Sequence, residues 1–124
     1  MVGDNSPRLD ELEIEIITRG DGALARISGR IDIDSSPALR DRFLALLEAP
    51  HAKVVSIDLS GVMHIDSSGV ATLIEALRIA RGYNTEVRLQ GLEGRLLRLF
   101  QSTGLLSLFN GSTRANTQSG SKAV

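Results

Sequence analysis

Apolar and polar residues alternate near the start of the chain. Leu12, Ile14 and Ile16 alternate with three glutamates, the period-two pattern of a strand with one buried face. A polar turn follows, and the alternation then resumes. The pattern therefore predicts two strands, near 12–18 and 23–29, that pair as an antiparallel hairpin.

Further along, the apolar spacing lengthens to three or four residues, the spacing of a helix. Ser-Ser-Pro at 35–37, where a serine oxygen can cap free amides, and a stop at Pro50 predict a helix over 36–49. The same spacing predicts helices over 67–81 and 93–103. The apolar positions behind these predictions are Leu39, Phe43, Leu46 and Leu47, then Val70, Leu73, Ile74 and Leu77, then Leu96, Leu97, Leu99 and Phe100.

Short apolar runs separate these helices. The β-branched run at 53–59 is typical of a central strand, and a connection over 60–66 leads on to the next helix. Alternation predicts a further strand at 86–90, and we interpret the run at 105–109 as a last short strand. Strands that alternate with helices predict an α/β fold. We expect a mixed β-sheet with an initial antiparallel hairpin and helices packed mainly on one face.

Both ends of the chain are polar. Residues 1–10 predict a flexible N-terminus, and the small polar residues of 110–124 predict a disordered tail. A single domain is therefore expected over 11–109. The whole chain has 124 residues, which suits one apolar core.

Composition excludes several classes of function. Lys and Arg total 14 against 15 Asp and Glu, so no excess positive charge attracts nucleic-acid phosphates or anionic lipid. We expect neither direct nucleic-acid binding nor membrane insertion, because no apolar stretch is long enough to span a bilayer. The absence of cysteine excludes thiol catalysis and agrees with a reducing compartment, so a cytoplasmic protein is expected.

An enzyme is also disfavoured. His64, Asp66 and Ser67 could be arranged as a hydrolase triad, but sequence neighbours rarely point at one another and no G-x-S-x-G motif surrounds the serine. His51 and His64 are too isolated for a metal site, and the glycines form no phosphate-binding loop. We therefore expect no catalytic activity, no metal and no cofactor.

The residues that suggest chemistry lie at 57–69, where a strand leads through a polar turn into a helix. The first amides of a helix lack internal acceptors, so an anion on Ser67 or Ser68 would be received there. A phosphate would add about −1.5 to −2 charges, which Asp66 would repel. The same residue types dominate helix caps in any protein, so plain capping is the alternative.

Three segments together resemble the STAS domain of anti-sigma factor antagonists: ISGRID at 27–32, VVSIDLSGVMHIDSSGVATLI at 54–74 and STGL at 102–105. The resemblance covers about 20–109. It implies that Ser67 is phosphorylated by the anti-sigma factor, a serine kinase of the histidine-kinase-like ATPase fold. The unphosphorylated protein would bind this kinase and free a sigma factor, phosphorylation would reverse the binding, and a serine phosphatase would restore it. Such partner switching regulates transcription.

The resemblance also implies a partner-binding surface made of Asp32, Asp66, Ser67, Ser68 and Gly69. The two aspartates would hydrogen-bond or charge-pair with the partner, and a phosphate would disrupt this contact by repulsion and bulk. Structural roles stay open for three of these residues. Asp66 can cap its helix, Asp32 can stabilise the loop that follows it, and Gly69 can relieve packing between helix and sheet.

A second role within the same superfamily stays open. The chain could be a STAS docking subunit of a lipid-transport ATPase, or a scaffold subunit of a stress-signalling assembly. The intact IDSSG sequence favours the antagonist, because a purely structural subunit has no need of a phosphorylatable serine.

Overall fold

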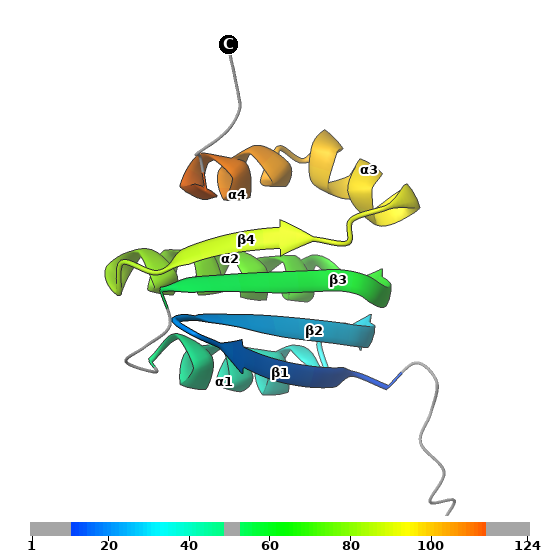
Figure 1. Ribbon diagram of the computed structural model, residues 1–124. Coiled ribbons are helices and arrows are strands. Elements are labelled where there is room, and N and C mark those ends of the chain that lie inside the picture. The colour runs from blue at the N-terminus through cyan, green and yellow to red at the C-terminus, as the bar shows by residue number, and fades with distance from the viewer. Residues whose placement is uncertain (1–10, 49–52, 114–124) are drawn as a thin grey trace, which may run out of the picture.

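The computed structural model describes residues 11–48 and 53–113. Its elements are β1 (Glu13–Arg19), β2 (Gly22–Ile31), α1 (Ser36–Leu47), β3 (Val54–Ile65), α2 (Ser67–Gly82), β4 (Glu86–Gln90), α3 (Gly94–Ser102) and α4 (Leu105–Thr113). The strands form one sheet in the order β1-β2-β3-β4 (Figure 1). β1 pairs antiparallel with β2, whereas β2, β3 and β4 are parallel. The predicted α/β fold with a mixed sheet and an initial hairpin is confirmed.

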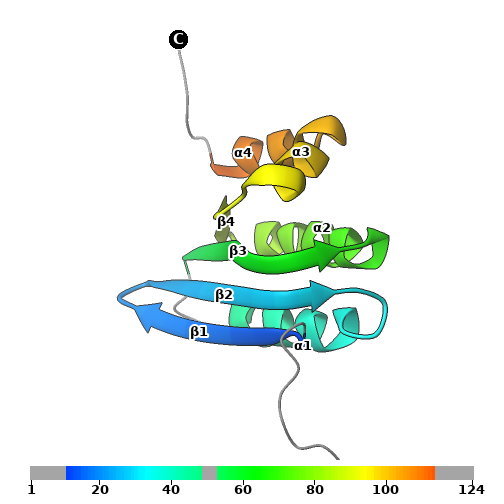
Figure 2. The same ribbon diagram turned by 90° about the vertical axis from the view of Figure 1, so that its right-hand side faces the viewer.

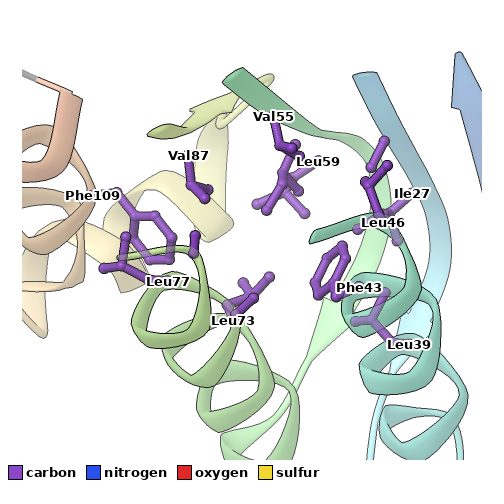
Figure 3. Close-up of a cluster of buried hydrophobic side chains, with 14 of the residues drawn as sticks. Ile27, Leu39, Phe43, Leu46, Val55, Leu59, Leu73, Leu77, Val87 and Phe109 are labelled. Atoms are coloured by element: carbon purple, nitrogen blue, oxygen red, sulfur yellow. The ribbon is translucent and has the colours of Figure 1, made fainter. Parts of the chain in front are cut away.

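The core lies between the sheet and the two helices α1 and α2, which cover one of its faces (Figures 1 and 2). Ile27 of β2 and Leu59 of β3 point toward Phe43 of α1 and Leu73 of α2 (Figure 3), and all four are buried. Removing these side chains from water is the main driving force for this packing. The alternating residues of β2 and β3 thus hold the two helices at fixed positions against the sheet.

Residues on the other side of the sheet pair by charge. Arg26 of β2 stands opposite Glu15 of β1 and Asp58 of β3 in the register. Its Nη1 lies 3.2 Å from Glu15 Oε1, and its Nε lies 3.7 Å from Asp58 Oδ2. The period-two pattern therefore separates an apolar face from a charged face, as the sequence indicated.

Helices α3 and α4 lie along the β4 edge of the sheet (Figures 1 and 2). The strand predicted at 105–109 is wrong, since these residues begin α4. Leu105 and Phe109 are both buried at helical spacing, and a five-residue apolar run is too short to separate the two periods. Helix α4 continues to Thr113, past the predicted start of the tail at 110. The predictions for 1–10 and 114–124 fall outside the described residues.

The connection predicted over 60–66 is also wrong, because β3 continues to Ile65. The second half of β3 pairs with β2 as far as the Ile31–Ile65 partners, whereas its pairing with β4 ends at Asp58. Because this half contains serine, glycine and histidine, it lacks the run of apolar residues that predicts a strand. At Gly61 a Cβ would lie only 2.8 Å from the Ser28 Cβ, so the close approach to β2 favours glycine.

Helix α1 begins where it was predicted but is capped differently. Ser35 occupies its N-cap position, yet its side chain makes no capping hydrogen bond. Helix α1 ends at Leu47, and 49–52 lie outside the described residues. Among the helices of the described ranges, none is both long enough and apolar enough to cross a membrane.

Candidate functional site

The candidate site lies where β2 and β3 end. Ile31 and Ile65 are register partners on these parallel strands, and the Asp66 amide donates to the Ile31 carbonyl at 3.1 Å. Each strand is followed at once by an aspartate, Asp32 after β2 and Asp66 after β3. The fold therefore brings these two residues, 34 positions apart, to the same end of the sheet, where the parallel strands β2 and β3 finish.

Asp66 caps α2. Its backbone is extended, and its Oδ1 accepts hydrogen bonds from the amides of Ser68 (2.9 Å) and Gly69 (3.2 Å) and from the Ser68 hydroxyl (2.6 Å). The Ser68 hydroxyl, followed by the Gly69 and Ser68 amides, lowers the pKa of Asp66 below its usual value. Asp66 is therefore an ionised cap at neutral pH, which realises the capping role that the sequence left open.

Ser67 is the first residue of α2 and is exposed. Its hydroxyl has no hydrogen-bond partner among the described residues, whereas the next two amides are held by Asp66. The expected reception of an anion by the first helix amides is therefore altered, because two of them are already occupied. What the geometry leaves available is a free hydroxyl beside a fixed negative charge.

Ser68 turns inward and links α2 to α1. Its hydroxyl lies 3.1 Å from that of Ser36, the first residue of α1. Ser36 was missed by the sequence reasoning. The signal that could have found it is a repeated tetrapeptide, since Ile-Asp-Ser-Ser occurs at 33–36 and again at 65–68.

Asp32 organises the loop between β2 and α1. Its Oδ1 accepts from the amides of Asp34 (3.0 Å) and Ser35 (3.1 Å), and its Oδ2 lies 3.9 Å from Arg30 Nε. This is the loop-stabilising role named as the alternative. The Asp32 side chain remains 28% exposed, so a partner can also reach it.

Gly69 is buried beneath the site. A Cβ there would lie 2.6 Å from both Ile31 Cγ2 and Ile65 Cγ1, distances at which the side chains would have to move. The glycine therefore lets α2 start close against the ends of β2 and β3, which favours the packing role over direct contact with a partner.

Comparison with known proteins adds the family to this geometry. The family model described as "Mlab, STAS domain" matches residues 18–109. This chain belongs to the STAS domain family. The match agrees with the resemblance drawn from the sequence over about 20–109.

The relatives of this STAS domain include named regulators. The anti-sigma-B factor antagonist of Bacillus subtilis is 30% identical over 89 residues, which cover 72% of this chain and 80% of the relative. That of Listeria monocytogenes is 34% identical over 79 residues, covering 64% and 68%. The crystal structure of an anti-sigma factor antagonist from Mycobacterium paratuberculosis is 26% identical, with a TM-score of 0.66 and coverage of 81% and 84%.

Two exposed apolar side chains lie near the site in the sequence of this STAS domain, and the sequence reasoning did not single them out. Ile33, in the loop after Asp32, is 73% exposed, and Met63, near the end of β3, is 65% exposed. Met63 also lines a groove of about 430 Å³ between β3 and α3, together with Leu96 and Leu99.

The hydrolase and metal hypotheses can be compared with the described side chains. The hydrogen bonds of the Asp66 carboxylate go to Ser68 and Gly69, so the described geometry holds no aspartate–histidine pair with His64. Within 11–48 and 53–113, no group of three or more His, Cys, Asp or Glu side chains could hold a metal ion. His51 lies outside the described residues.

Proposed function

We propose that this STAS domain is an anti-sigma factor antagonist controlled by phosphorylation of Ser67. The free, exposed Ser67 hydroxyl beside the ionised Asp66 carries the proposal, and relatives named as anti-sigma-B factor antagonists support it. In the unphosphorylated form the domain binds an anti-sigma factor serine kinase of the histidine-kinase-like ATPase fold, and this frees a sigma factor. A serine phosphatase removes the phosphate and restores binding.

The occupied helix amides explain why a phosphate acts as a switch. The Ser67 oxygen takes the terminal phosphoryl group of the partner's ATP, ADP leaves, and the hydroxyl proton passes to a base on the partner. The phosphate brings about −1.5 to −2 charges next to the Asp66 carboxylate. Because that carboxylate already holds the amides of Ser68 and Gly69, the new anion is repelled rather than bound, and it projects toward the partner's surface.

The partner contact combines charge with apolar area. Asp32 and Asp66 supply carboxylates at the end of the sheet where β2 and β3 finish, and the exposed Ile33 and Met63 supply apolar contact. Complementary charge favours correct docking of a basic partner surface. Burial of apolar side chains in such a contact adds to the affinity. A phosphate on Ser67 adds negative charge to the middle of this surface and opposes both contributions.

The test uses four purified proteins as baits in lysate of the source bacterium: wild type, Ser67→Ala, Ser67→Asp and Ser107→Asp. Ser107 is exposed on α4, so its variant adds the same charge away from the site. We expect wild type, Ser67→Ala and Ser107→Asp to retain an anti-sigma factor of the histidine-kinase-like fold, and Ser67→Asp to lose it. Mass spectrometry of the native chain should find phosphate on Ser67.

A different result would favour the docking role. If all four baits capture the same transport ATPase or stress-signalling assembly, and native Ser67 carries no phosphate, then the domain is a docking or scaffold subunit and the switch proposed for Ser67 is wrong.

A further inference from the structure

Three oxygen atoms join the starts of α1 and α2. The Ser68 hydroxyl donates to Asp66 Oδ1 at 2.6 Å and lies 3.1 Å from the Ser36 hydroxyl. A serine hydroxyl carries one proton. Since the proton of Ser68 is committed to the carboxylate, Ser36 must be the donor in the serine–serine bond. The result is a directed series from Ser36 to Ser68 to Asp66.

The first member of the series is itself firmly held. Ser36 is only 6% exposed, and its amide donates to the Asp32 carbonyl at 2.8 Å. The Asp32 carboxylate in turn binds the amides of Asp34 and Ser35. The series therefore ties the loop of one candidate aspartate to the carboxylate of the other.

We propose that Ser36 is a positioning residue, which fixes the orientation of the Asp66 carboxylate through Ser68 and so couples the loop after β2 to the phosphorylation site. The coupling to partner binding rests on the proposed function, whereas the positioning concerns the isolated domain alone. Ser36 is almost fully buried, and it acts on the Asp66 carboxylate through its neighbour Ser68.

The strength of the last bond in the series explains the effect. A distance of 2.6 Å between Ser68 Oγ and Asp66 Oδ1 is that of a charge-assisted hydrogen bond. A hydroxyl that accepts a hydrogen bond becomes a better donor, so Ser36 strengthens the bond between Ser68 and the carboxylate. Without Ser36, the Ser68 hydroxyl is less constrained, and Asp66 is held mainly by backbone amides, those of Ser68, Gly69 and Ile33.

Nuclear magnetic resonance on the isolated domain tests the positioning. The variants are Ser36→Ala and, as a matched control, Thr72→Val. Thr72 is 7% exposed and donates its hydroxyl to the Ser68 carbonyl at 3.0 Å, so its variant also removes one buried hydroxyl from the same helix junction. We expect Ser36→Ala to move the carboxyl carbon signal of Asp66 at neutral pH, and Thr72→Val to leave it at the wild-type position.

Ser36→Cys guards against a variant that fails to fold, because it keeps the shape and offers only a weak donor; it should move the Asp66 signal in the same direction by less. An Asp66 signal that is unchanged in folded Ser36→Ala or Ser36→Cys overturns the proposal. A signal that moves equally in Thr72→Val also overturns it, because the effect would then be general loosening of the junction.

A binding measurement tests the coupling. With the captured anti-sigma factor kinase, Ser36→Ala should raise Kd about fivefold, the effect of one lost hydrogen bond, and Thr72→Val should leave Kd near wild type. An unchanged Kd with a shifted Asp66 signal refutes the coupling and keeps the positioning. If no kinase is captured by wild type, the proposed function fails, and the Asp66 signal alone decides whether Ser36 positions the carboxylate.

Discussion

The two helix starts of this STAS domain share the tetrapeptide Ile-Asp-Ser-Ser, at 33–36 and 65–68, yet they are built differently. At the first start, Asp34 is exposed and lies outside the helix, and Ser35 takes the N-cap position. At the second start, Asp66 is itself the N-cap. The same four residues are therefore shifted by one position relative to the helix that follows them.

The length of the connection from the preceding strand accounts for this shift. One residue, Asp66, joins β3 to α2, whereas four residues join β2 to α1. In the longer connection Asp32 accepts the loop amides, and the Ser35 hydroxyl donates to the Arg30 carbonyl at 2.9 Å. In the shorter connection, Ser67, the third residue of the tetrapeptide, is exposed to solvent. Whether the first serine of the tetrapeptide has a free hydroxyl is thus determined by the number of residues between strand and helix, and not by the tetrapeptide sequence itself.

The largest difference in stability is expected between substitutions at the residues that follow the two tetrapeptides, Gly69 and Pro37. Gly69→Ala should lower the free energy of unfolding by about 1–3 kcal/mol, because the new methyl group would overlap Ile31 and Ile65. This loss outweighs the roughly 1 kcal/mol that alanine gains over glycine in a helix. The corresponding Pro37→Ala, at an exposed position, should change it by less than about 0.5 kcal/mol. Urea unfolding measures both, and equal effects would refute the packing difference.

A smaller difference in unfolding free energy is expected between alanine substitutions of Ser35 and Ser67, the third residues of the two tetrapeptides. Ser35→Ala should cost about 1 kcal/mol of unfolding free energy, since its hydroxyl bonds the Arg30 carbonyl and the Asp32 amide. Ser67→Ala should lie within about 0.5 kcal/mol of wild type, because that hydroxyl has no partner among the described residues. Thermal and urea unfolding of the two variants would contradict the comparison if Ser67→Ala were the more costly.

The smallest expected effect is on the loss of stability at acid pH. Because its folded pKa is lowered by the Ser68 hydroxyl, Asp66 stabilises the fold above its unfolded pKa of about 3.9, and this contribution is lost as the pH falls through the folded value. The Ser60 amide likewise lowers the pKa of Asp58. Asp66→Asn should therefore flatten, without abolishing, the loss of stability below about pH 4. Urea midpoints measured from pH 2 to pH 6 check this. If the midpoint of Asp66→Asn fell with pH as steeply as that of wild type, Asp66 would not contribute to the loss of stability in acid.

Most of the fold could be predicted because the apolar period is carried by long segments with one buried face. The wrong predictions fall on segments that are short or that lack a regular buried face. The second half of β3 pairs on one side only, with β2, so Ser60, Gly61 and His64 replace the expected apolar residues. At 105–109 five apolar-rich residues suit a strand or a helix equally, and burial of Leu105 and Phe109 decides between them only in three dimensions.

The site was predictable where it depends on local chemistry. Asp66 as a cap follows from residue type at a helix start, whereas the exposure of Ser67 comes from the structure alone. The contact between Ser36 and Ser68 joins residues 32 positions apart on different helices, and no periodic pattern reports such a distance. The exposure of Ile33 and Met63 likewise depends on how the two strand ends are placed.

The unequal lengths of β3 and β4 have a mechanical consequence. Beyond Asp58, β3 pairs with β2 alone among the described strands, and register shifts interrupt this pairing between Arg26 and Ser28 and between Gly29 and Arg30, so fewer hydrogen bonds resist deformation here than where β4 also pairs. A force on Ser67 therefore acts first on α2, to which Ser67 belongs, and on the paired ends of β3 and β2, and through β2 on the loop of Asp32. Helix α4 ends at the opposite end of the sheet from the start of α2 (Figure 1), so a reporter fused after α4 would be attached at the other end of the sheet from Ser67.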